Sequence, residues 1–190
     1  MPNLILIRHS ESQPDSSVPA NQWRLSHQGR ELCKPLAEEL SVYQPALLIS
    51  SLEPKAIETA QLAARHLGIG SEIADGLQEH DRSNVPFLAS QESFDRQVLQ
   101  MFEKPGELVF GGESADQAYE RFSAAINNLL NEFEHQTIGL ITHGTVLSLF
   151  VARNNGLDPH EFWRSLEIPA FVVLGLPHFD IVTTLQRVDL

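Results

Sequence analysis

The stretch Leu4-Ile5-Leu6-Ile7-Arg8-His9-Ser10 (LILIRHS) is the most informative segment of the chain. Its first four residues are apolar without alternation, which is typical of a strand buried on both faces of a sheet. Strands of this kind belong to parallel sheets that helices cover on both sides. Because the apolar run ends in an arginine and a histidine, we expect these polar side chains at the carboxyl end of the strand.

Similar apolar runs recur along the chain, separated by segments with the apolar spacing of helices. The clearest runs cover residues 46–49 and 137–142, and a weaker one covers residues 72–74. The tail, residues 170–176 and 179–188, has the pattern of an edge hairpin. This alternation predicts an α/β fold with three layers, α/β/α, and a mostly parallel central sheet with an antiparallel edge strand.

The length of 190 residues fits one domain, and no linker, repeat or low-complexity tract divides the chain. We therefore expect a single domain over residues 1–190, in which residues 83–112 form a less regular, cap-like excursion. One amphipathic segment, at about residues 91–103, lies within that excursion. Capping residues and prolines predict the ends of the helices. They predict helices that start after Ser26, Ser114 and Asp158, a helix from Pro54 to Gly68, a helix over 145–154, and a kink or late helix start at Pro35.

The chain has 25 acidic and 13 basic residues, a formal net charge of −12 with histidine neutral. This balance argues against nucleic acid as a partner, because such affinity depends on basic groups that displace counterions, and against an anionic membrane surface. The single cysteine, Cys33, excludes an intrachain disulfide, and no apolar stretch approaches the ~20 residues of a membrane span. We expect a cytoplasmic monomer or homodimer that binds a small anion through a few concentrated cations.

Reactive side chains follow each predicted strand of the parallel sheet. In open α/β sheets, ligands bind in the crevice beyond the carboxyl ends of the strands. The side chains expected there are, strand by strand, Arg8 and His9, Ser51 and Lys55, Glu79 and Arg82, and His143 followed by Gly144. The sequence therefore predicts two histidines, several cations and an acid around one site.

This set of side chains suits phosphoryl transfer without a metal or another cofactor. A neutral imidazole is a competent nucleophile near neutral pH. Cationic side chains neutralise the oxygens of a phosphoryl group, and a helix that begins at Gly144 adds backbone N–H donors. A carboxyl group whose pKa is raised can protonate a leaving alkoxide. These residues favour a reaction through a phosphohistidine.

The same segments resemble a known family over nearly the whole chain. The matching motifs are, in order, Arg8-His9, Leu25-Ser26-His27-Gln28-Gly29, Ser51-x-x-x-Lys55-Ala56-x-x-Thr59-Ala60, Leu77-x-Glu79, Gly112-Glu113-Ser114 and Thr142-His143-Gly144. Each motif is weak alone, but their order and spacing together are specific. The chain resembles the histidine phosphatase superfamily, which has the phosphoglycerate-mutase-like fold.

The resemblance implies roles for individual residues. By it, His9 is the phosphorylated nucleophile, and Arg8, Lys55 and His143 bind the transferring phosphoryl group. Glu79 first protonates the leaving group and then activates the water that hydrolyses the phosphoenzyme. The resemblance implies no metal, and it implies a small phosphorylated metabolite as the substrate.

Three departures from the family pattern affect the predicted phosphate site. Ser10 stands where glycine or alanine is commoner, so its hydroxyl either fits a tight turn or contacts the phosphate. Lys55 replaces the usual arginine, and a point charge without a bidentate fork predicts a looser grip on phosphate. The asparagine often found a few residues after the signature is absent, with Pro14 and Asp15 in that stretch. We expect Arg82 to supply the missing guanidinium.

The leading hypothesis is a phosphatase, and three alternatives stay open. Mutases of this family are longer and carry additional basic residues after the acid, whereas residues 83–112 hold only Arg96 and Lys104. A catalytically weakened phospholigand-binding module is favoured by the Lys55 substitution alone. A phosphohistidine-protein phosphatase is the third alternative, although such relatives are usually shorter and lack a clear acid.

Selectivity is expected to come from the excursion after the acid. Residues Val85–Leu88 and Phe94 predict a partly apolar cap over the site, which favours monoesters with an apolar portion over bisphosphates. In the same region His80 is a candidate substrate contact. Arg121, in the middle of a predicted helix, is expected to form a structural ion pair.

Overall fold

The structure is a computed structural model that describes residues 2–85 and 90–190. The strands in the described residues are β1 Asn3–Arg8, β2 Leu47–Ser50, β3 Gly70–Ile73, β4 Ile138–Thr142, β5 Ala170–Gly175 and β6 Asp180–Leu185. They form one sheet in the order β3-β2-β4-β1-β5-β6. The strands β1 to β4 run parallel, whereas β5 and β6 are antiparallel to their neighbours. The predicted mostly parallel sheet with an antiparallel edge is confirmed.

Strand β1 lies inside the sheet because its side chains are apolar on both faces. Leu4, Ile5, Leu6 and Ile7 are fully buried. Successive side chains of a strand point to opposite faces, and here the leucines join one core while the isoleucines join the other. Burial on both faces explains why the sequence shows no alternation.

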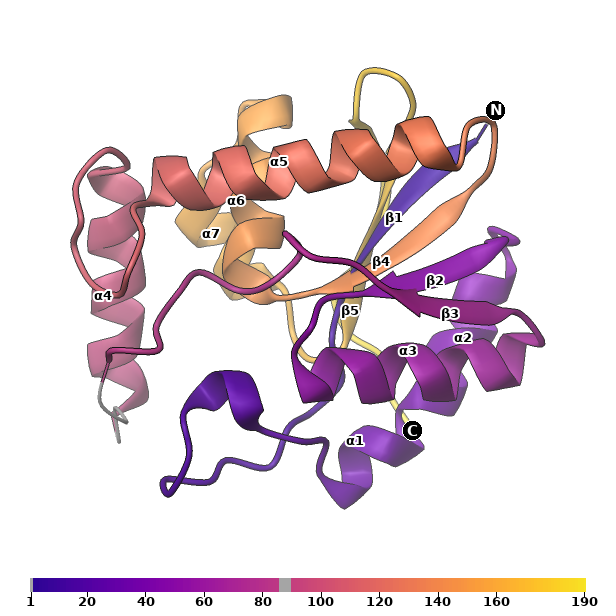
Figure 1. The fold of residues 1–190 in the computed structure, drawn as a ribbon, viewed down its shortest axis with the longest axis horizontal. Coiled ribbons are helices and arrows are strands. Elements are labelled where there is room, and N and C mark those ends of the chain that lie inside the picture. The colour runs from indigo at the N-terminus through magenta and orange to yellow at the C-terminus, as the bar shows by residue number, and fades with distance from the viewer. Residues whose placement is uncertain (1, 86–89) are drawn as a thin grey trace.

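Helices cover both faces of the sheet and make the three predicted layers (Figure 1). One face carries α1 His27–Glu31, α2 Cys33–Ser41 and α3 Pro54–Leu67, and the other carries α4 Gln91–Glu103, α5 Ala115–Glu132, α6 Gly144–Asn155 and α7 Pro159–Ser165. A short 3-10 turn, η1 Ala20–Gln22, lies in the segment between β1 and α1. Figure 1 shows α5 and α6 on one side of the strands and α2 and α3 on the other.

The capping residues identified in the sequence begin and end the helices as expected. The Ser26 hydroxyl accepts a hydrogen bond from an α1 backbone N–H, and Ser114 forms a reciprocal capping box with Gln117 at the start of α5. Asp158 caps α7 in the same way. Gly68 ends α3 with a φ of 71°, a left-handed conformation that glycine adopts without strain.

Two predicted elements differ in detail. The expected kinked helix after Ser26 is two helices that meet at Leu32, and Pro35 lies in the first turn of α2, where its missing N–H costs no hydrogen bond. The weak third strand begins at Gly70 instead of residue 72. Its side chains are exposed at the sheet edge, so the apolar signal that marks the buried strands is absent there.

Helix α4 has the bounds predicted for the amphipathic segment, with Val98, Met101 and Phe102 buried in the core. Of the apolar residues predicted to cover the site, Pro86, Phe87 and Leu88 lie outside the described residues, while Val85 and Phe94 lie within them. Among the described residues, none of the helices has the length and apolar character needed to cross a bilayer.

Candidate active site

The carboxyl ends of β1 and β4 bring the two predicted histidines together. These strands pair in parallel with Arg8 opposite Thr142, so the next residue of each strand, His9 and His143, emerges at the same edge. Their ring centroids are 5.1 Å apart at an interplanar angle of 61°. Both imidazoles are almost fully buried.

His9 is held in one orientation by the backbone of the next residue. Its Nδ1 lies 2.7 Å from the carbonyl oxygen of Ser10, and because a carbonyl only accepts, Nδ1 carries the proton and Nε2 keeps its lone pair. Burial lowers the pKa of His9 well below 6.5, and the positive charge of Lys55 and the neighbouring His143 lower it further. The imidazole is therefore neutral near pH 7, as a nucleophile must be.

His143 is oriented through contacts of its Nε2, whereas His9 is oriented through its Nδ1. Its Nε2 lies 2.7 Å from the Ser51 hydroxyl and 3.3 Å from a carboxylate oxygen of Glu53. Its Nδ1 is buried and has no hydrogen-bond partner within the described residues. Burial and then Lys55 lower the pKa of His143 well below 6.5. A buried imidazole nitrogen without a partner is free to contact a ligand oxygen.

Arg8 is partly buried and lies beside these rings. One of its terminal nitrogens donates to the carbonyl oxygen of Leu166, whereas its Nε is buried and has no partner in the part of the chain that the structure describes. Burial lowers the pKa of Arg8 to about 10, which keeps the guanidinium charged at neutral pH. Gly144 makes this placement sterically feasible, because a Cβ there would lie 3.0 Å from Arg8 Cζ and 3.1 Å from Trp163 Nε1.

Lys55, on the first turn of α3, is buried and already has partners. Its Nζ lies 2.8 Å from a carboxylate oxygen of Glu53 and donates to the Ala20 carbonyl over 2.7 Å. Glu53 was not among the predicted site residues. It occupies the N-cap position of α3 without making a cap hydrogen bond, because its carboxylate contacts Lys55, His143 and the backbone N–H of Glu79 instead. The adjoining Pro54 was the only signal in the sequence, and it marked a helix start.

Glu79 lies at the N-terminus of α6. Its carboxylate accepts hydrogen bonds from the backbone N–H groups of Thr145, over 3.1 Å, and Val146, over 3.3 Å. Burial alone would raise the pKa of this carboxyl, but the Arg82 guanidinium, His143 and the backbone N–H groups of His80 and Thr145 hold it below 4.5. In the ligand-free site, Glu79 therefore lacks the raised pKa expected of a general acid. The backbone N–H groups of Thr145 and Val146 already donate to Glu79. The predicted phosphate contact at the start of α6 therefore depends on the N–H of Gly144 itself.

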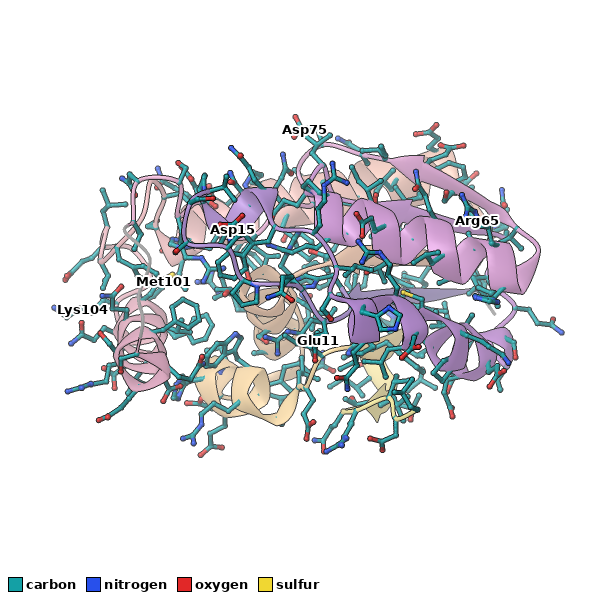
Figure 2. The ribbon with its side chains drawn as sticks, turned by 90° about the horizontal axis from the view of Figure 1, so that it is seen from below. Glu11, Asp15, Arg65, Asp75, Met101 and Lys104 are labelled. Carbon is teal, nitrogen blue, oxygen red and sulfur yellow. The ribbon has the colours of Figure 1, made fainter. Side chains whose placement is uncertain are left out.

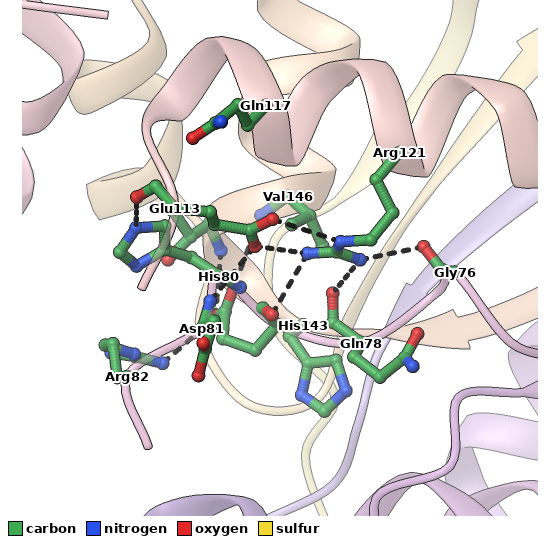
Figure 3. A network of polar contacts seen from close by, with 12 residues as sticks. Gly76, Gln78, His80, Asp81, Arg82, Glu113, Gln117, Arg121, His143 and Val146 are labelled. Atoms are coloured by element: carbon green, nitrogen blue, oxygen red, sulfur yellow. Dashed lines mark hydrogen bonds and ion pairs between the residues drawn. The ribbon is translucent and has the colours of Figure 1, made fainter. Parts of the chain in front are cut away.

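A network of polar contacts holds the segment that carries Glu79 (Figure 3). The guanidinium of Arg121, on α5, donates to the carbonyl oxygens of Gly76, Gln78 and Glu79 at 2.9, 3.0 and 3.2 Å. It also pairs with Glu113, which in turn accepts from the backbone N–H of Asp81. The predicted ion pair of Arg121 is confirmed, and its bonds to the loop carbonyls make it a positioning residue for Glu79.

The remaining predicted residues have different surroundings. Arg82 lies 3.4 Å from the Glu79 carboxylate, and its guanidinium carbon lies 4.8 Å from the centre of the Phe94 ring. The Ser10 hydroxyl is fully buried and donates to the Gly29 carbonyl over 2.7 Å, so it stabilises a turn and does not reach the site. His80 is likewise buried, with its Nε2 2.7 Å from the Glu113 carbonyl and its Nδ1 without a hydrogen-bond partner among the described residues, so its substrate contact stays a prediction.

The site adjoins a cavity of about 570 Å³. Arg8, His9, Lys55, Glu79 and Arg82 all line it. The segment between β1 and α1 forms part of its wall. In the view of Figure 2, Asp15 of that segment appears between Lys104, just after α4, and Arg65, on α3. Among the described residues, no group of three or more histidine, cysteine or acidic side chains is arranged to hold a metal ion.

Comparison with known proteins identifies this arrangement. The model of the histidine phosphatase superfamily (branch 1) matches residues 4–174. The chain belongs to this superfamily. Phosphoserine phosphatase 1 of Hydrogenobacter thermophilus is 25% identical to this histidine phosphatase family member over 173 residues, 86% of this chain and 81% of that protein. Phosphoglycerate mutase-like protein 4 of Arabidopsis thaliana is 26% identical over 154 residues, 76% of this chain and 67% of that protein.

Solved structures of the superfamily share the fold. YhfR of Bacillus stearothermophilus superposes with a TM-score of 0.76 at 18% identity, over 96% of each chain. A mycobacterial glucosyl-3-phosphoglycerate phosphatase superposes with a TM-score of 0.74 at 20% identity, over 99% of this chain and 97% of that one. The family and the relatives named as phosphatases support a phosphoric monoester hydrolase of the histidine phosphatase type.

Proposed function

We propose that this chain is a metal-independent phosphatase that hydrolyses a small phosphate monoester through a phosphohistidine on His9. The observation that carries the proposal is the orientation of His9, whose Nδ1 is held by the Ser10 carbonyl so that Nε2 is left for the substrate. Two unpartnered buried polar atoms, Arg8 Nε and His143 Nδ1, support a phosphoryl group beside it.

In the first step the lone pair of His9 Nε2 attacks phosphorus. The bond from phosphorus to the ester oxygen breaks, and that oxygen takes a proton from Glu79. The phosphoryl group is then attached to nitrogen, with its oxygens facing Arg8 and Lys55.

In the second step Glu79, now a carboxylate, takes a proton from water. The hydroxide so formed attacks phosphorus, the phosphorus–nitrogen bond breaks, and inorganic phosphate leaves with His9 restored. The pKa of Glu79 is low in the ligand-free site, and a bound phosphate dianion raises it because like charges disfavour ionisation. Substrate binding thus prepares the acid that the first step needs.

A trapping experiment with para-nitrophenyl phosphate tests the proposal. The wild-type chain should release phosphate in the presence of a metal chelator and form an acid-labile phosphoenzyme in a rapid quench at alkaline pH. His9→Ala should lose both signals, and His27→Ala, which alters an exposed histidine, should keep both. Phosphate release by His9→Ala at the wild-type rate would contradict the proposed nucleophile.

A phospholigand-binding module is the second candidate, favoured by the pairing of Lys55 with Glu53, which neutralises one of the site's cations. It predicts phosphate binding without turnover or phosphohistidine in the same experiment. A mutase, the activity suggested by the name of the Arabidopsis relative, predicts efficient phosphoglycerate isomerisation with 2,3-bisphosphoglycerate. In our proposal the substrate is a small phosphorylated metabolite of the cytoplasm, and a monomer or homodimer carries the activity.

A further inference from the structure

The charged residues of the active-site cavity are concentrated at its phosphate end. Within the described part of the chain, the charged side chains that line the cavity are Arg8, Lys55, Glu79 and Arg82. Glu79 pairs with Arg82, and Arg8 and Lys55 both exert an electrostatic effect on His9. Arg8, Lys55 and Glu79 therefore surround the place where phosphorus reacts, and Arg82 lies between Glu79 and the Phe94 ring.

The rest of the cavity wall combines an apolar face with uncharged polar side chains, and it comes from distant parts of the sequence. Val18 and Trp23 belong to the segment after β1, Phe94 to α4, and Trp163 to α7. Ile168 lies at the same wall with 36% of its surface exposed. Uncharged polar side chains complete the lining without adding charge: Ser12, Ser16, Ser17, Ser83, Gln91 and Thr145.

The aromatic part of this wall is held in place by its neighbours. The Phe94 and Trp163 rings meet edge to face with centroids 5.9 Å apart. Behind them His160 stacks on Trp163 at 19° and lies 3.0 Å from an Asp95 carboxylate oxygen, which joins α7 to α4. A wall fixed in this way presents a preformed apolar surface to a ligand.

Two of the cations that line the cavity already have acidic partners, so they offer little free positive charge to a second anion. Lys55 is paired with Glu53, and Arg82 lies between the Glu79 carboxylate and the Phe94 ring. A carboxylate or second phosphate on the leaving group would find only Arg82 as a cation beside the apolar wall among the described lining residues, and Arg82 is already paired with Glu79. Burying a charge that is incompletely paired is costly. The net charge of −12 adds a repulsive background to that cost.

We propose that the leaving group of the substrate is uncharged and mainly apolar, and that it packs between the segment carrying Val18 and Trp23 and the wall formed by Phe94, Trp163 and Ile168. The inference rests on the proposed phosphatase function and names the substrate class of the same site. It differs from the substrates in the names of two similar proteins, phosphoserine and glucosyl-3-phosphoglycerate, which both carry a carboxylate.

A matched pair of esters tests this inference without a difference in leaving-group chemistry. Butyl phosphate and 4-phosphonooxybutanoate are esters of primary alcohols with similar acidity, and they differ by a terminal carboxylate. We expect kcat/KM for butyl phosphate to be about tenfold higher or more, the ratio that corresponds to about 1.4 kcal/mol. We expect 2-phenylethyl phosphate to be better still, because its ring adds apolar contact with Phe94 and Trp163.

Two variants locate the effect in the cavity wall. Ile168→Lys places a cation among the apolar residues and should raise kcat/KM for 4-phosphonooxybutanoate by about tenfold, whereas the uncharged control Ile168→Gln should keep the wild-type order of substrates. Phe94→Ala should lower kcat/KM for 2-phenylethyl phosphate more than for butyl phosphate. Circular dichroism and thermal unfolding check that each variant is folded.

The outcomes separate this inference from the function on which it rests. Full turnover with equal or better use of the carboxylate ester by the wild-type chain would overturn the inference and leave the phosphatase proposal intact. Absence of turnover of every ester, together with absence of phosphohistidine, would overturn the phosphatase proposal and the inference with it.

Discussion

Glu53 and Lys55 form a buried ion pair beside the two active-site histidines, with 2.8 Å between the carboxylate oxygen and Nζ and 7% of each side chain exposed. The other Glu53 oxygen accepts from the Glu79 backbone N–H and lies 3.3 Å from His143 Nε2. One acidic side chain thus contacts a phosphate-binding cation, the second histidine and the backbone of the acid. The lysine that replaces the family's arginine is held in place by this carboxylate.

Replacing Glu53 by glutamine should have opposite effects on folding and on phosphate binding. The variant leaves Lys55 buried without its counter-charge, and losing one partner of a buried ion pair costs about 3–5 kcal/mol of unfolding free energy. The same change frees the Lys55 charge for phosphate, so the inhibition constant of inorganic phosphate should fall. Urea denaturation and competitive inhibition measure the two effects.

The control for this variant is Glu38→Gln, which alters an exposed partner of Lys34 and should change stability by less than about 0.5 kcal/mol. Weaker phosphate binding by a folded Glu53→Gln chain would contradict the idea that Glu53 competes with phosphate for Lys55.

Gly144→Ala should damage the site through contact with Arg8. The new Cβ would lie 3.0 Å from Arg8 Cζ and 3.1 Å from Trp163 Nε1; Trp163 is buried and Arg8 is bonded to the Leu166 carbonyl, so neither side chain can easily move. We expect a loss of about 1–3 kcal/mol of stability, typical of overpacking, with a higher KM because the guanidinium is displaced. Gly106→Ala, whose Cβ would have only an ordinary contact at 3.5 Å, is the control. Equal kinetics and stability for the two variants would disprove the steric argument.

Stability should fall as the pH drops below about 6.5. Folded His9 and His143 have pKa values well below 6.5 and stay neutral, whereas in the unfolded chain they bind protons near that pH. The unfolded state then binds more protons, so the free energy of unfolding decreases by up to about 1.4 kcal/mol per pH unit for each histidine. The lowered pKa of Glu79 adds a loss only below 4.5. Urea denaturation from pH 7 to pH 5 measures the slope, and His9→Asn should reduce it; an unchanged slope would refute this account.

Arg121→Gln should slow hydrolysis of the phosphoenzyme more than its formation from para-nitrophenyl phosphate. The nitrophenolate leaves without a proton, whereas attack by water needs Glu79 in position as a base. The variant loses the bonds that hold the loop carbonyls of Gly76, Gln78 and Glu79. We expect a lower kcat with more phosphohistidine at steady state, seen as a burst in stopped-flow absorbance. Arg65→Gln, on the outer end of α3 (Figure 2), is the control, and a kcat loss without accumulated phosphohistidine would argue for a structural role alone.

Much of this architecture could be predicted because it depends on patterns repeated along the chain. The unbroken apolar run at residues 4–7 marked a central strand, and parallel pairing of two such runs necessarily placed His9 and His143 at one edge. Ser114 and Asp158 began helices because their side chains satisfy N–H groups within the next turn. Interactions of this kind are local and can be inferred from neighbouring residues.

The directions of side chains at the site could not be inferred in the same way. Whether Glu53 caps α3 or contacts Lys55 depends on a lysine two residues further and on His143, far along the chain. The Ser10 hydroxyl was compatible with a ligand or a turn, and the Gly29 carbonyl decides between them. The pKa of Glu79 depends on the α6 N–H groups, which only the folded chain brings to its carboxylate.

The hydrogen bonds between Glu79 and the first turn of α6 affect the protonation of Glu79 in the proposed cycle. A carboxylate caps a helix as an anion, and protonation weakens its capacity to accept hydrogen bonds and its attraction to the helix dipole. Helix α6 is buried along residues 144–152 and cannot shift to follow the change. The protonated acid therefore binds the helix start less well than the carboxylate does, which favours transfer of its proton to the departing alkoxide oxygen.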